Sequence, residues 1–470
     1  MKEIYTKEYI NNQIIFIEKC KEIIKEKFKT NSPSFFVHSY GCQGNVSEGE
    51  KIKGILKEIG FVETESIEKA NIIILNTCAI REKAQEKVFS NLGNILNLKL
   101  SDKNKIIGVC GCMVQQKHVK ERLEVNFKGV NLIFGPHVIY KLPQMLFEIL
   151  YNEKKRYFDL EEKTTVEEGI PILRNSNIKA LVPISYGCNN FCSYCIVPYV
   201  KGRERSRNFE VILKEVKELV EKGYKEIMLL GQNVNSYGLD LNLKDGFSKL
   251  LSEINNIKGD FWVRFMTSHP KDFTKNLIDS ISKCDKVCKH FHLPVQSGCD
   301  IILTNMNRKY TVKKYLEIIE YCRKKIEGVT FTTDIIVGFP GETYENFKET
   351  LNLVKKVEYT SIFNFIFSKR VGTKAEKMLD NVPKKEKIKW LEELIETQNK
   401  ISFKLNQRYV GKTEKVLFDG LKKTDNNSIV GKSEKNILVC CEKKDASIGE
   451  FYNVKIKKAH RTQLEGELII

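Results

Sequence analysis

Three cysteines lie within eight residues of one another in the stretch ISYGCNNFCSYCIVPYVKGRERSR, with the spacing CxxxCxxC. They are Cys188, Cys192 and Cys195, and no histidine lies between Gly187 and Arg207. A structural zinc site usually takes four ligands in paired CxxC or Cys/His groups, whereas a cubane iron–sulfur cluster is normally held by four cysteines. Three thiolates would leave one iron of a cubane open to a substrate or cofactor. The spacing therefore favours a 4Fe–4S cluster over two alternatives, a chance grouping of three cysteines in a loop and a zinc site that borrows a distant ligand.

A second set of three cysteines is spread over the first part of the chain. Cys42 follows the apolar run FFVHSY, Cys78 follows NIIILN, and Cys112 follows KIIGVC, and each run predicts a buried strand. The carboxyl ends of parallel strands lie at one edge of an open α/β sheet, where ligands bind, so these thiols can converge there. Cys110 lies within its predicted strand and is a weaker candidate. Buried, unreactive thiols are the alternative for this trio.

A run of basic residues follows the CxxxCxxC stretch directly. Lys201, Arg203, Arg205 and Arg207 alternate with other residues, and Glu204 is the only acid among them. A solvated surface is the usual explanation of such a run. Beside a cofactor site we expect phosphate contacts with RNA instead.

The elements that must position these residues fall into four regions. Residues 1–32 have the pattern of a helical extension, and residues 33–150 alternate buried strands with helices, which predicts a parallel α/β sheet. Residues 174–403 contain six strand patterns, each but the last followed by a helix, which predicts an open, partial (β/α)6 barrel with its functional loops after the strands. Residues 404–470 alternate in short runs with glycine turns, which predicts a small antiparallel β-barrel of a kind that often binds oligonucleotides.

Composition and charge limit the class of protein. A chain of 470 residues should fold into two to four domains. No apolar run reaches the roughly 20 residues that span a bilayer, and no cleavage site follows the first residues, so we expect a cytoplasmic protein without a membrane anchor. The 14 cysteines should then stay reduced, as metal ligands or packed thiols. The formal net charge of +18 favours a polyanionic partner, although a lysine-rich solvated surface would explain it equally well.

The two trios, the barrel and the terminal β-barrel occur in an order that resembles the methylthiotransferase family of radical S-adenosylmethionine (SAM) enzymes. The resemblance covers nearly the whole chain after residue 33 and is carried by long stretches: NTCAIREKAQEKVFSNLG, CIVPYVKGRERSR, LLGQNVNSYG, RFMTSHPKDF, HLPVQSG and MNRKYT. It implies that the terminal barrel is a TRAM domain, an RNA-binding module. It also implies two 4Fe–4S clusters, one held by each trio, and SAM as both radical source and methyl donor.

The activity that the resemblance implies is sulfur insertion and methylation at carbon 2 of an N(6)-dimethylallyl-adenosine beside the anticodon of tRNA. The expected partners are a tRNA anticodon stem-loop, an electron donor such as flavodoxin or ferredoxin, and a sulfur or cluster carrier protein. Three alternatives remain: a methylthiotransferase for threonylcarbamoyl-adenosine, one for an aspartate of a ribosomal protein, and a non-enzymatic RNA-binding protein with structural clusters.

Polar residues that directly follow predicted strands are candidates for holding SAM. Gln232 and Asn233 lie in LLGQNVN, Ser268 lies in TSHP and Gln296 lies in PVQSG. Tyr194, just before the last cysteine of CxxxCxxC, is a further candidate. Each of the four strand-end residues could equally be a loop-capping residue.

Overall fold

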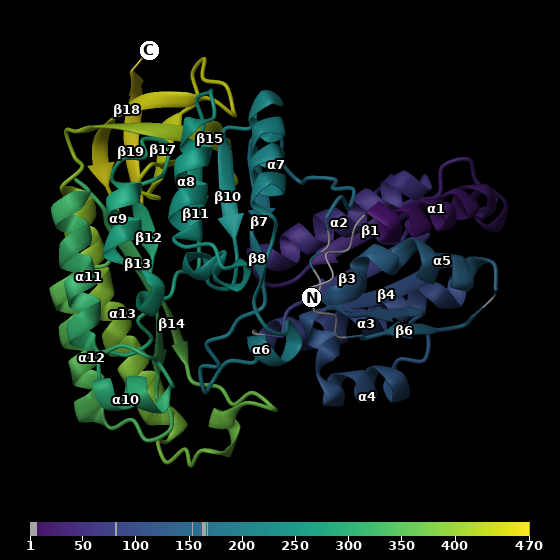
Figure 1. The fold of residues 1–470 in the computed structure, drawn as a ribbon, viewed down its shortest axis with the longest axis horizontal. Helices are drawn as coiled ribbons and strands as arrows, with labels where there is room; N and C mark the ends of the chain where they lie inside the picture. The colour runs from purple at the N-terminus through teal and green to yellow at the C-terminus, as the bar shows by residue number, and fades with distance from the viewer. Residues whose placement is uncertain (1–6, 80–81, 153, 162–165, 167, 470) are drawn as a thin grey trace. The chain divides into compact units, whose positions relative to one another are not determined.

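The structure is a computed structural model that describes residues 7–79, 82–152, 154–161, 166 and 168–469 (Figure 1). The chain divides into two compact units by its internal contacts. The first comprises Met1–Asn175, Tyr186–Asn189 and Cys195–Arg207, and the second comprises Ser176–Ser185, Asn190–Tyr194 and Asn208–Ile470. In the part of the chain described, no helix is both long and apolar enough to cross a membrane.

The first unit is built on a six-stranded sheet in which every pair of neighbours is parallel. Its strand order is β2-β1-β3-β4-β5-β6, and the strands are β1 (Ser34–Ser39), β2 (Val62–Glu63), β3 (Ile72–Thr77), β4 (Ile106–Gly111), β5 (Leu132–Phe134) and β6 (Tyr157–Asp159). The runs FFVHSY, NIIILN and KIIGVC form β1, β3 and β4, as predicted. The sheet also includes β6, which lies beyond residue 150, the predicted end of this region.

Helices cover both faces of this sheet. They are α1 (Lys7–Phe28), α2 (Gln43–Ile59), α3 (Glu82–Ser101), α4 (Lys117–Asn126), α5 (Leu142–Leu150) and α6 (Val197–Val200), with the 3-10 turns η1 (Cys112–Gln115) and η2 (Pro136–Lys141). Alternate residues of β3 pack into two separate cores, Ile72 and Ile74 with α1, α2 and α5, and Ile73 and Leu75 with α3 and α4. The predicted N-terminal helix is therefore part of a core layer, to which α1 contributes buried side chains.

The second unit contains the predicted barrel. Three parallel strands form the order β11-β10-β7 and three more form β12-β13-β14, and a parallel bridge from Val263 to Val287 connects the two sets. The six strands are β7 (Lys179–Pro183), β10 (Glu226–Leu230), β11 (Trp262–Phe265), β12 (His290–His292), β13 (Thr330–Val337) and β14 (Ser361–Ile366). Two short strands, β8 (Ser185–Tyr186) and β9 (Arg205–Ser206), flank the CxxxCxxC loop in sequence.

Helices pack on the outside of these strands and form one continuous apolar core with them. They are α7 (Phe209–Glu221), α8 (Gly246–Asn256), α9 (Lys275–Ile281), α10 (Asp300–Asn305), α11 (Val312–Lys325), α12 (Tyr344–Val357) and α13 (Lys384–Gln407). The 3-10 turns are η3 (Val234–Ser236), η4 (Leu239–Leu241), η5 (Pro270–Asp272) and η6 (Lys374–Lys377). The prediction that no helix follows the last strand is wrong, because α13 follows β14 and packs its apolar side, including Trp390 and Leu394, into the core.

The C-terminal strands close into the predicted small barrel, in the order β15-β16-β17-β19-β18. They are β15 (Thr413–Lys422), β16 (Asp425–Ser433), β17 (Leu438–Glu442), β18 (Phe451–Ala459) and β19 (Gln463–Ile469). The barrel is not wholly antiparallel as predicted, because β17 and β19 pair in parallel. A closed barrel leaves no unpaired edge, and this order lets β19 complete the ring between β17 and β18.

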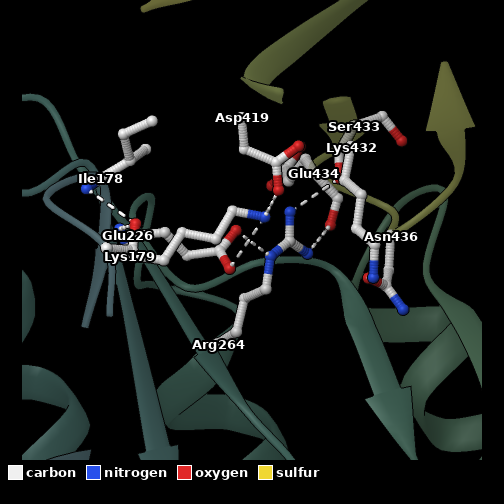
Figure 2. Close-up of polar contacts among 10 residues, drawn as sticks. Ile178, Lys179, Glu226, Arg264, Asp419, Lys432, Ser433, Glu434 and Asn436 are labelled. Atoms are coloured by element: carbon white, nitrogen blue, oxygen red, sulfur yellow. Dashed lines mark hydrogen bonds and ion pairs between the residues drawn. The ribbon is translucent and has the colours of Figure 1, made fainter. Parts of the chain in front are cut away.

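The terminal barrel is attached to the amino ends of the core strands by a buried polar network (Figure 2). Arg264 on β11 donates to the carboxylate of Glu226 at 2.7 Å, and to the carbonyl oxygens of Ser433 and Glu434 at 2.8 and 3.1 Å. Lys179, the first residue of β7, pairs with Asp419 of β15. Trp262 packs edge-on against Phe451, with ring centroids 4.8 Å apart. The barrel therefore lies at the amino ends of the core strands of the second unit.

We predict that Arg264→Met weakens this attachment strongly. The change leaves the Glu226 carboxylate buried without its main partner and two carbonyl groups without a donor, which should cost about 3 kcal/mol or more. The midpoint of urea unfolding, followed by the fluorescence of Trp262 in a Trp390→Phe background, would report the loss. The control Lys225→Met removes an exposed pair with Glu450 and should cost less than about 1 kcal/mol. Equal shifts for the two variants would show that the network does not hold the barrel.

Candidate functional site

The Cys42, Cys78 and Cys112 trio lies at the carboxyl edge of the sheet in the first unit, as the sequence predicts. Cys42 precedes α2, Cys78 follows β3, and Cys112 opens the turn η1 after β4. Cys78 and Cys112 are buried, Cys42 is partly exposed, and Cys42 accepts a hydrogen bond from Cys78. Of the residues described, no three His, Cys, Asp or Glu side chains form a group that could hold a single metal ion.

Two buried asparagines pin the loops that carry the trio. Asn45 donates from its side-chain amide to the carbonyl oxygen of Thr77 at 3.0 Å, and Asn76 donates to the carbonyl oxygen of Asn45 at 2.7 Å. The Cys42 thiol donates to the side-chain oxygen of Asn45 at 3.2 Å. Because buried amides are costly when unpaired, these bonds hold the start of α2 against the end of β3.

Glycines leave room around the same thiols. A Cβ atom at Gly111, where φ is +95°, would lie 2.4 Å from the Thr77 carbonyl oxygen, so only glycine permits this close approach. A Cβ atom at Gly44 would lie 3.5 Å from the Cys42 sulfur and 3.7 Å from the Lys201 nitrogen. The absence of a side chain at Gly44 therefore leaves both groups uncovered on this side, which fits a bound cluster.

The electrostatics of the trio are uneven. The hydrogen bond from Cys78, opposed by burial and supported by the charge of Lys201, lowers the pKa of the Cys42 thiol to about 5. Burial raises the pKa of Cys112 to about 12 although Lys201 acts against it. Burial also raises the pKa of Cys110 well above its ordinary value, and Cys110 packs in the apolar core, as its place within β4 predicts. Cys42 is therefore more ready to ionise than Cys112.

Lys201 lies at this trio and not on an open surface. Its ammonium group pairs with the Glu48 carboxylate at 2.8 Å, and both side chains are more than 90% buried. Burial alone would lower the pKa of Lys201, but Cys112, Glu48 and Cys42 outweigh it and raise that pKa well above its ordinary value. The prediction of a phosphate contact from Lys201 therefore has no support in the structure, because its charge is directed inward.

The other three basic residues of the run differ in exposure. Arg207 makes a forked pair with Glu168 at 2.7 to 3.0 Å, and Arg205 contacts a ring nitrogen of His137 at 3.3 Å; both arginines are buried. These internal contacts argue against direct phosphate contacts from either residue. Arg203 is exposed and remains a candidate for contact with RNA.

The CxxxCxxC loop is held at both of its ends. In the first unit, the Cys188 amide donates to the Gly202 carbonyl oxygen at 3.1 Å, and a Cβ atom at Gly187, where φ is +71°, would lie 2.1 Å from the Arg203 carbonyl oxygen. In the second unit, Ser193 donates from its hydroxyl to the Asn305 carbonyl oxygen at 2.8 Å. Cys188 and Cys195 belong to the first unit and Cys192 to the second.

Arg308 contacts the buried cysteine of this loop and was not singled out from the sequence. Its guanidinium donates to the Cys192 sulfur at 3.5 Å and to the Pro294 carbonyl oxygen at 2.7 Å. Burial alone would lower the pKa of Arg308, but Tyr310, Tyr194 and Cys192 raise it well above its ordinary value. A fixed positive charge therefore accompanies this thiol. The only sequence signal was the position of Arg308 inside the stretch MNRKYT.

The predicted SAM residues occupy different environments at the carboxyl ends of the barrel strands. Asn233 is engaged internally, since it donates to Asp272 at 2.7 Å and accepts from the His269 amide at 3.1 Å. Gln296 is buried with φ at +71°, while Gln232 is partly exposed. Tyr194 packs against an apolar cluster that includes Phe339.

Some buried polar atoms at these strand ends have no hydrogen-bond partner among the residues described. They are the hydroxyl oxygens of Ser185 and Ser268 and the side-chain amide of Asn235. Buried polar groups without partners are rare in folded proteins and point to a missing ligand or water. This pattern fits a bound polar cofactor, supports Ser268 among the predicted residues, and adds Ser185 and Asn235, which the sequence analysis missed.

Comparison with protein families agrees with this division of the chain. The family described as "Uncharacterized protein family UPF0004" matches residues 34–135, the Radical SAM superfamily matches residues 182–354, and the TRAM domain matches residues 407–469. Among solved structures, the fold is similar to that of TsrM, a radical SAM methyltransferase from Kitasatospora setae, with a TM-score of 0.54 and 12% identity over 73% of this chain and 74% of TsrM. OxsB, a cobalamin-dependent SAM radical enzyme, gives a TM-score of 0.53 and 13% identity over 79% of this chain and 58% of OxsB.

Curated relatives match over nearly the full length. A tRNA-2-methylthio-N(6)-dimethylallyladenosine synthase of Clostridium botulinum is 49% identical over 95% of this chain and 100% of the relative. Proteins of the same name from Thermoanaerobacter pseudethanolicus and Clostridium tetani are 47% and 48% identical, over 96% and 93% of this chain and 96% and 97% of those proteins. With matches to the Radical SAM superfamily and the TRAM domain and with relatives that are similar over nearly its whole length, this chain belongs to the tRNA-2-methylthio-N(6)-dimethylallyladenosine synthase family of radical SAM methylthiotransferases.

Proposed function

We propose that this protein converts N(6)-dimethylallyladenosine beside the anticodon of tRNA to its 2-methylthio derivative. The observation that carries the proposal is that Cys42, Cys78 and Cys112 each lie just after a strand of one parallel sheet, in a chain that also carries CxxxCxxC. A single trio would suit many radical SAM reactions. A second trio supplies the separate site that sulfur insertion needs, and the full-length relatives carry the same activity in their name.

The reaction explains why cofactors are required. It replaces the hydrogen at carbon 2 of an adenine ring by a methylthio group, and that carbon–hydrogen bond is not acidic enough for any side chain to deprotonate. Cofactors supply such chemistry while the protein binds and orients them. When bound, two 4Fe–4S clusters and SAM supply the radical, the sulfur atom and the methyl group.

The chain's own residues then have distinct roles. Cys188, Cys192 and Cys195 hold the cluster at which SAM is cleaved, and Cys42, Cys78 and Cys112 hold the auxiliary cluster that carries sulfur. The SAM site is lined by Tyr194, Gln232, Asn233, Ser268 and Gln296. The buried polar atoms of Ser185 and Asn235 that have no hydrogen-bond partner support a place for this site at the strand ends.

RNA binding falls to the TRAM barrel and to Arg203. The segment from Lys404 to the end carries 14 Lys/Arg and 9 Asp/Glu, a net charge of 14 − 9 = +5. The barrel lies at the amino ends of the core strands. These strands include β10, with five residues, and β13, with eight, and strands of these lengths are roughly 17–26 Å long. The tRNA must therefore extend over at least that distance to contact the barrel and present its base at the carboxyl ends. The other partners are an electron donor such as flavodoxin or ferredoxin and a sulfur or cluster carrier, all in the cytoplasm.

The activity is tested by nucleoside analysis. The protein, reconstituted with iron and sulfide under anaerobic conditions, should convert tRNA that carries N(6)-dimethylallyladenosine when SAM and a low-potential reductant are present. Mass spectrometry of the digested tRNA should show a nucleoside in which methylthio replaces one hydrogen. Matched tRNA with unmodified adenosine should give none. Product formed only on threonylcarbamoyl-adenosine tRNA, or none on any tRNA, would contradict the proposal.

We predict that exposed lysines of β18 contribute to tRNA binding through phosphate contacts. Lys455 and Lys458 are exposed on this strand, and each phosphate contact releases counterions when it forms. Lys455→Gln/Lys458→Gln should weaken tRNA binding and reduce the slope of log K against log salt by about 1.4 to 1.8. The control Lys217→Gln/Lys222→Gln changes two exposed lysines at α7 and should leave the slope unchanged. Equal slopes for the β18 variant and the native protein would remove this strand from the RNA interface.

A further inference from the structure

We propose that Lys201 is a positioning residue of the auxiliary site, a fixed positive charge that is held in place by Glu48 and sets the reduction potential of the cluster. The inference rests on the proposed function, because it requires Cys42, Cys78 and Cys112 to hold a cluster. It assigns Lys201 a role within the protein that differs from the phosphate contact predicted by the sequence.

Both partners of the ion pair, Lys201 and Glu48, lie near the cysteines of the trio. Glu48 lies on α2, six residues after Cys42, and Lys201 follows α6, whose residue Val200 packs against Cys112. The Lys201 nitrogen and the Cys42 sulfur lie within 3.7 and 3.5 Å of the same point, the position of a Cβ atom at Gly44. The ammonium group of Lys201 therefore lies close to the Cys42 sulfur while it pairs with Glu48.

Burying the Lys201–Glu48 ion pair costs free energy unless the charge of Lys201 also compensates another charge nearby. Removing an ammonium group from water is expensive, and a buried pair often does no better than apolar side chains of the same volume. The pair itself is neutral, and Glu48 has one carboxylate oxygen without a hydrogen-bond partner among the residues described. Three thiolates beside the pair add negative charge that Lys201 is placed to balance. The charge of Lys201 also acts on His137, which contacts Arg205.

The two charges should act on a cluster in opposite directions. Reduction adds one negative charge to the cluster, so a nearby positive charge stabilises the reduced state and a nearby negative charge destabilises it. Lys201 should therefore raise the reduction potential and Glu48 should lower it. A purely structural role would not predict opposite signs.

The test measures the potential of the auxiliary cluster alone. In the full-length protein with Cys188→Ala/Cys192→Ala/Cys195→Ala, only the Cys42 trio can hold a cluster, and its reduction can be titrated by electron paramagnetic resonance. Lys201→Met should shift the one-electron reduction equilibrium toward the oxidised state at least about tenfold, which lowers the reduction potential by about 59 mV. Glu48→Gln should shift the equilibrium toward the reduced state. Lys201→Arg keeps the charge, so its equilibrium should differ from that of the parent variant by less than about tenfold.

A matched control lies on the same helix. Glu50 is also buried on α2 but lies two residues from Glu48 and so on a different side of the helix. Its carboxylate pairs with Arg174 at 3.8 Å and accepts from the Asn175 amide at 2.9 Å, so Glu50→Gln should leave the potential unchanged. Lys201→Met could fail to assemble a cluster, because it leaves Glu48 buried without its partner. In that case the Glu48→Gln variant tests the inference, and a shift toward the reduced state supports it. Shifts of the same sign in both variants, or no shift, would overturn the inference and leave the proposed function intact. No cluster signal in the parent variant would overturn both.

Discussion

The structure of the first unit depends on one constraint: three separate loops, each of which carries a cysteine, must lie together at the carboxyl edge of one parallel sheet. The register of β1, β3 and β4 brings the loops to one edge, but register alone does not fix the positions of loop side chains. Asn45 and Asn76 fix the loops relative to each other through hydrogen bonds from their buried side-chain amides. The glycines at 44 and 111 complete the arrangement, one by leaving space and the other by allowing close backbone contact.

The second unit separates two tasks along the length of its strands. The CxxxCxxC loop and the unpartnered polar atoms of Ser185, Ser268 and Asn235 follow the carboxyl ends of the barrel strands. The TRAM barrel is joined to the amino ends by Arg264 and its partners. Such a division suits a long substrate such as tRNA, because one end of the strands can bind phosphates while the other carries the chemistry.

The sequence predicted the strands because buried parallel strands are nearly continuous apolar runs. It also predicted the places of Cys42, Cys78 and Cys112 just after the carboxyl ends of those strands, where ligands bind in such sheets. It did not predict the burial of Lys201, since a lysine in a basic run looks the same whether its partner is water, phosphate or a glutamate from a distant helix. Arg308 was missed for the same reason: its contact with Cys192 forms only in the folded chain, and the sequence around it does not show which group it pairs with. The parallel pairing of β17 with β19 was missed because strand order in a closed barrel depends on tertiary closure and not on local patterns.

The central claim is that the two trios perform separate steps, and the most direct measurement is a comparison of two triple variants with SAM and tRNA. Cys188→Ala/Cys192→Ala/Cys195→Ala should release no 5′-deoxyadenosine and form no methylthiolated nucleoside, because SAM is not cleaved. Cys42→Ala/Cys78→Ala/Cys112→Ala should still release 5′-deoxyadenosine but insert no sulfur. A methylthiolated nucleoside formed by the variant that lacks the Cys42 trio would contradict the account, because the sulfur would then come from elsewhere.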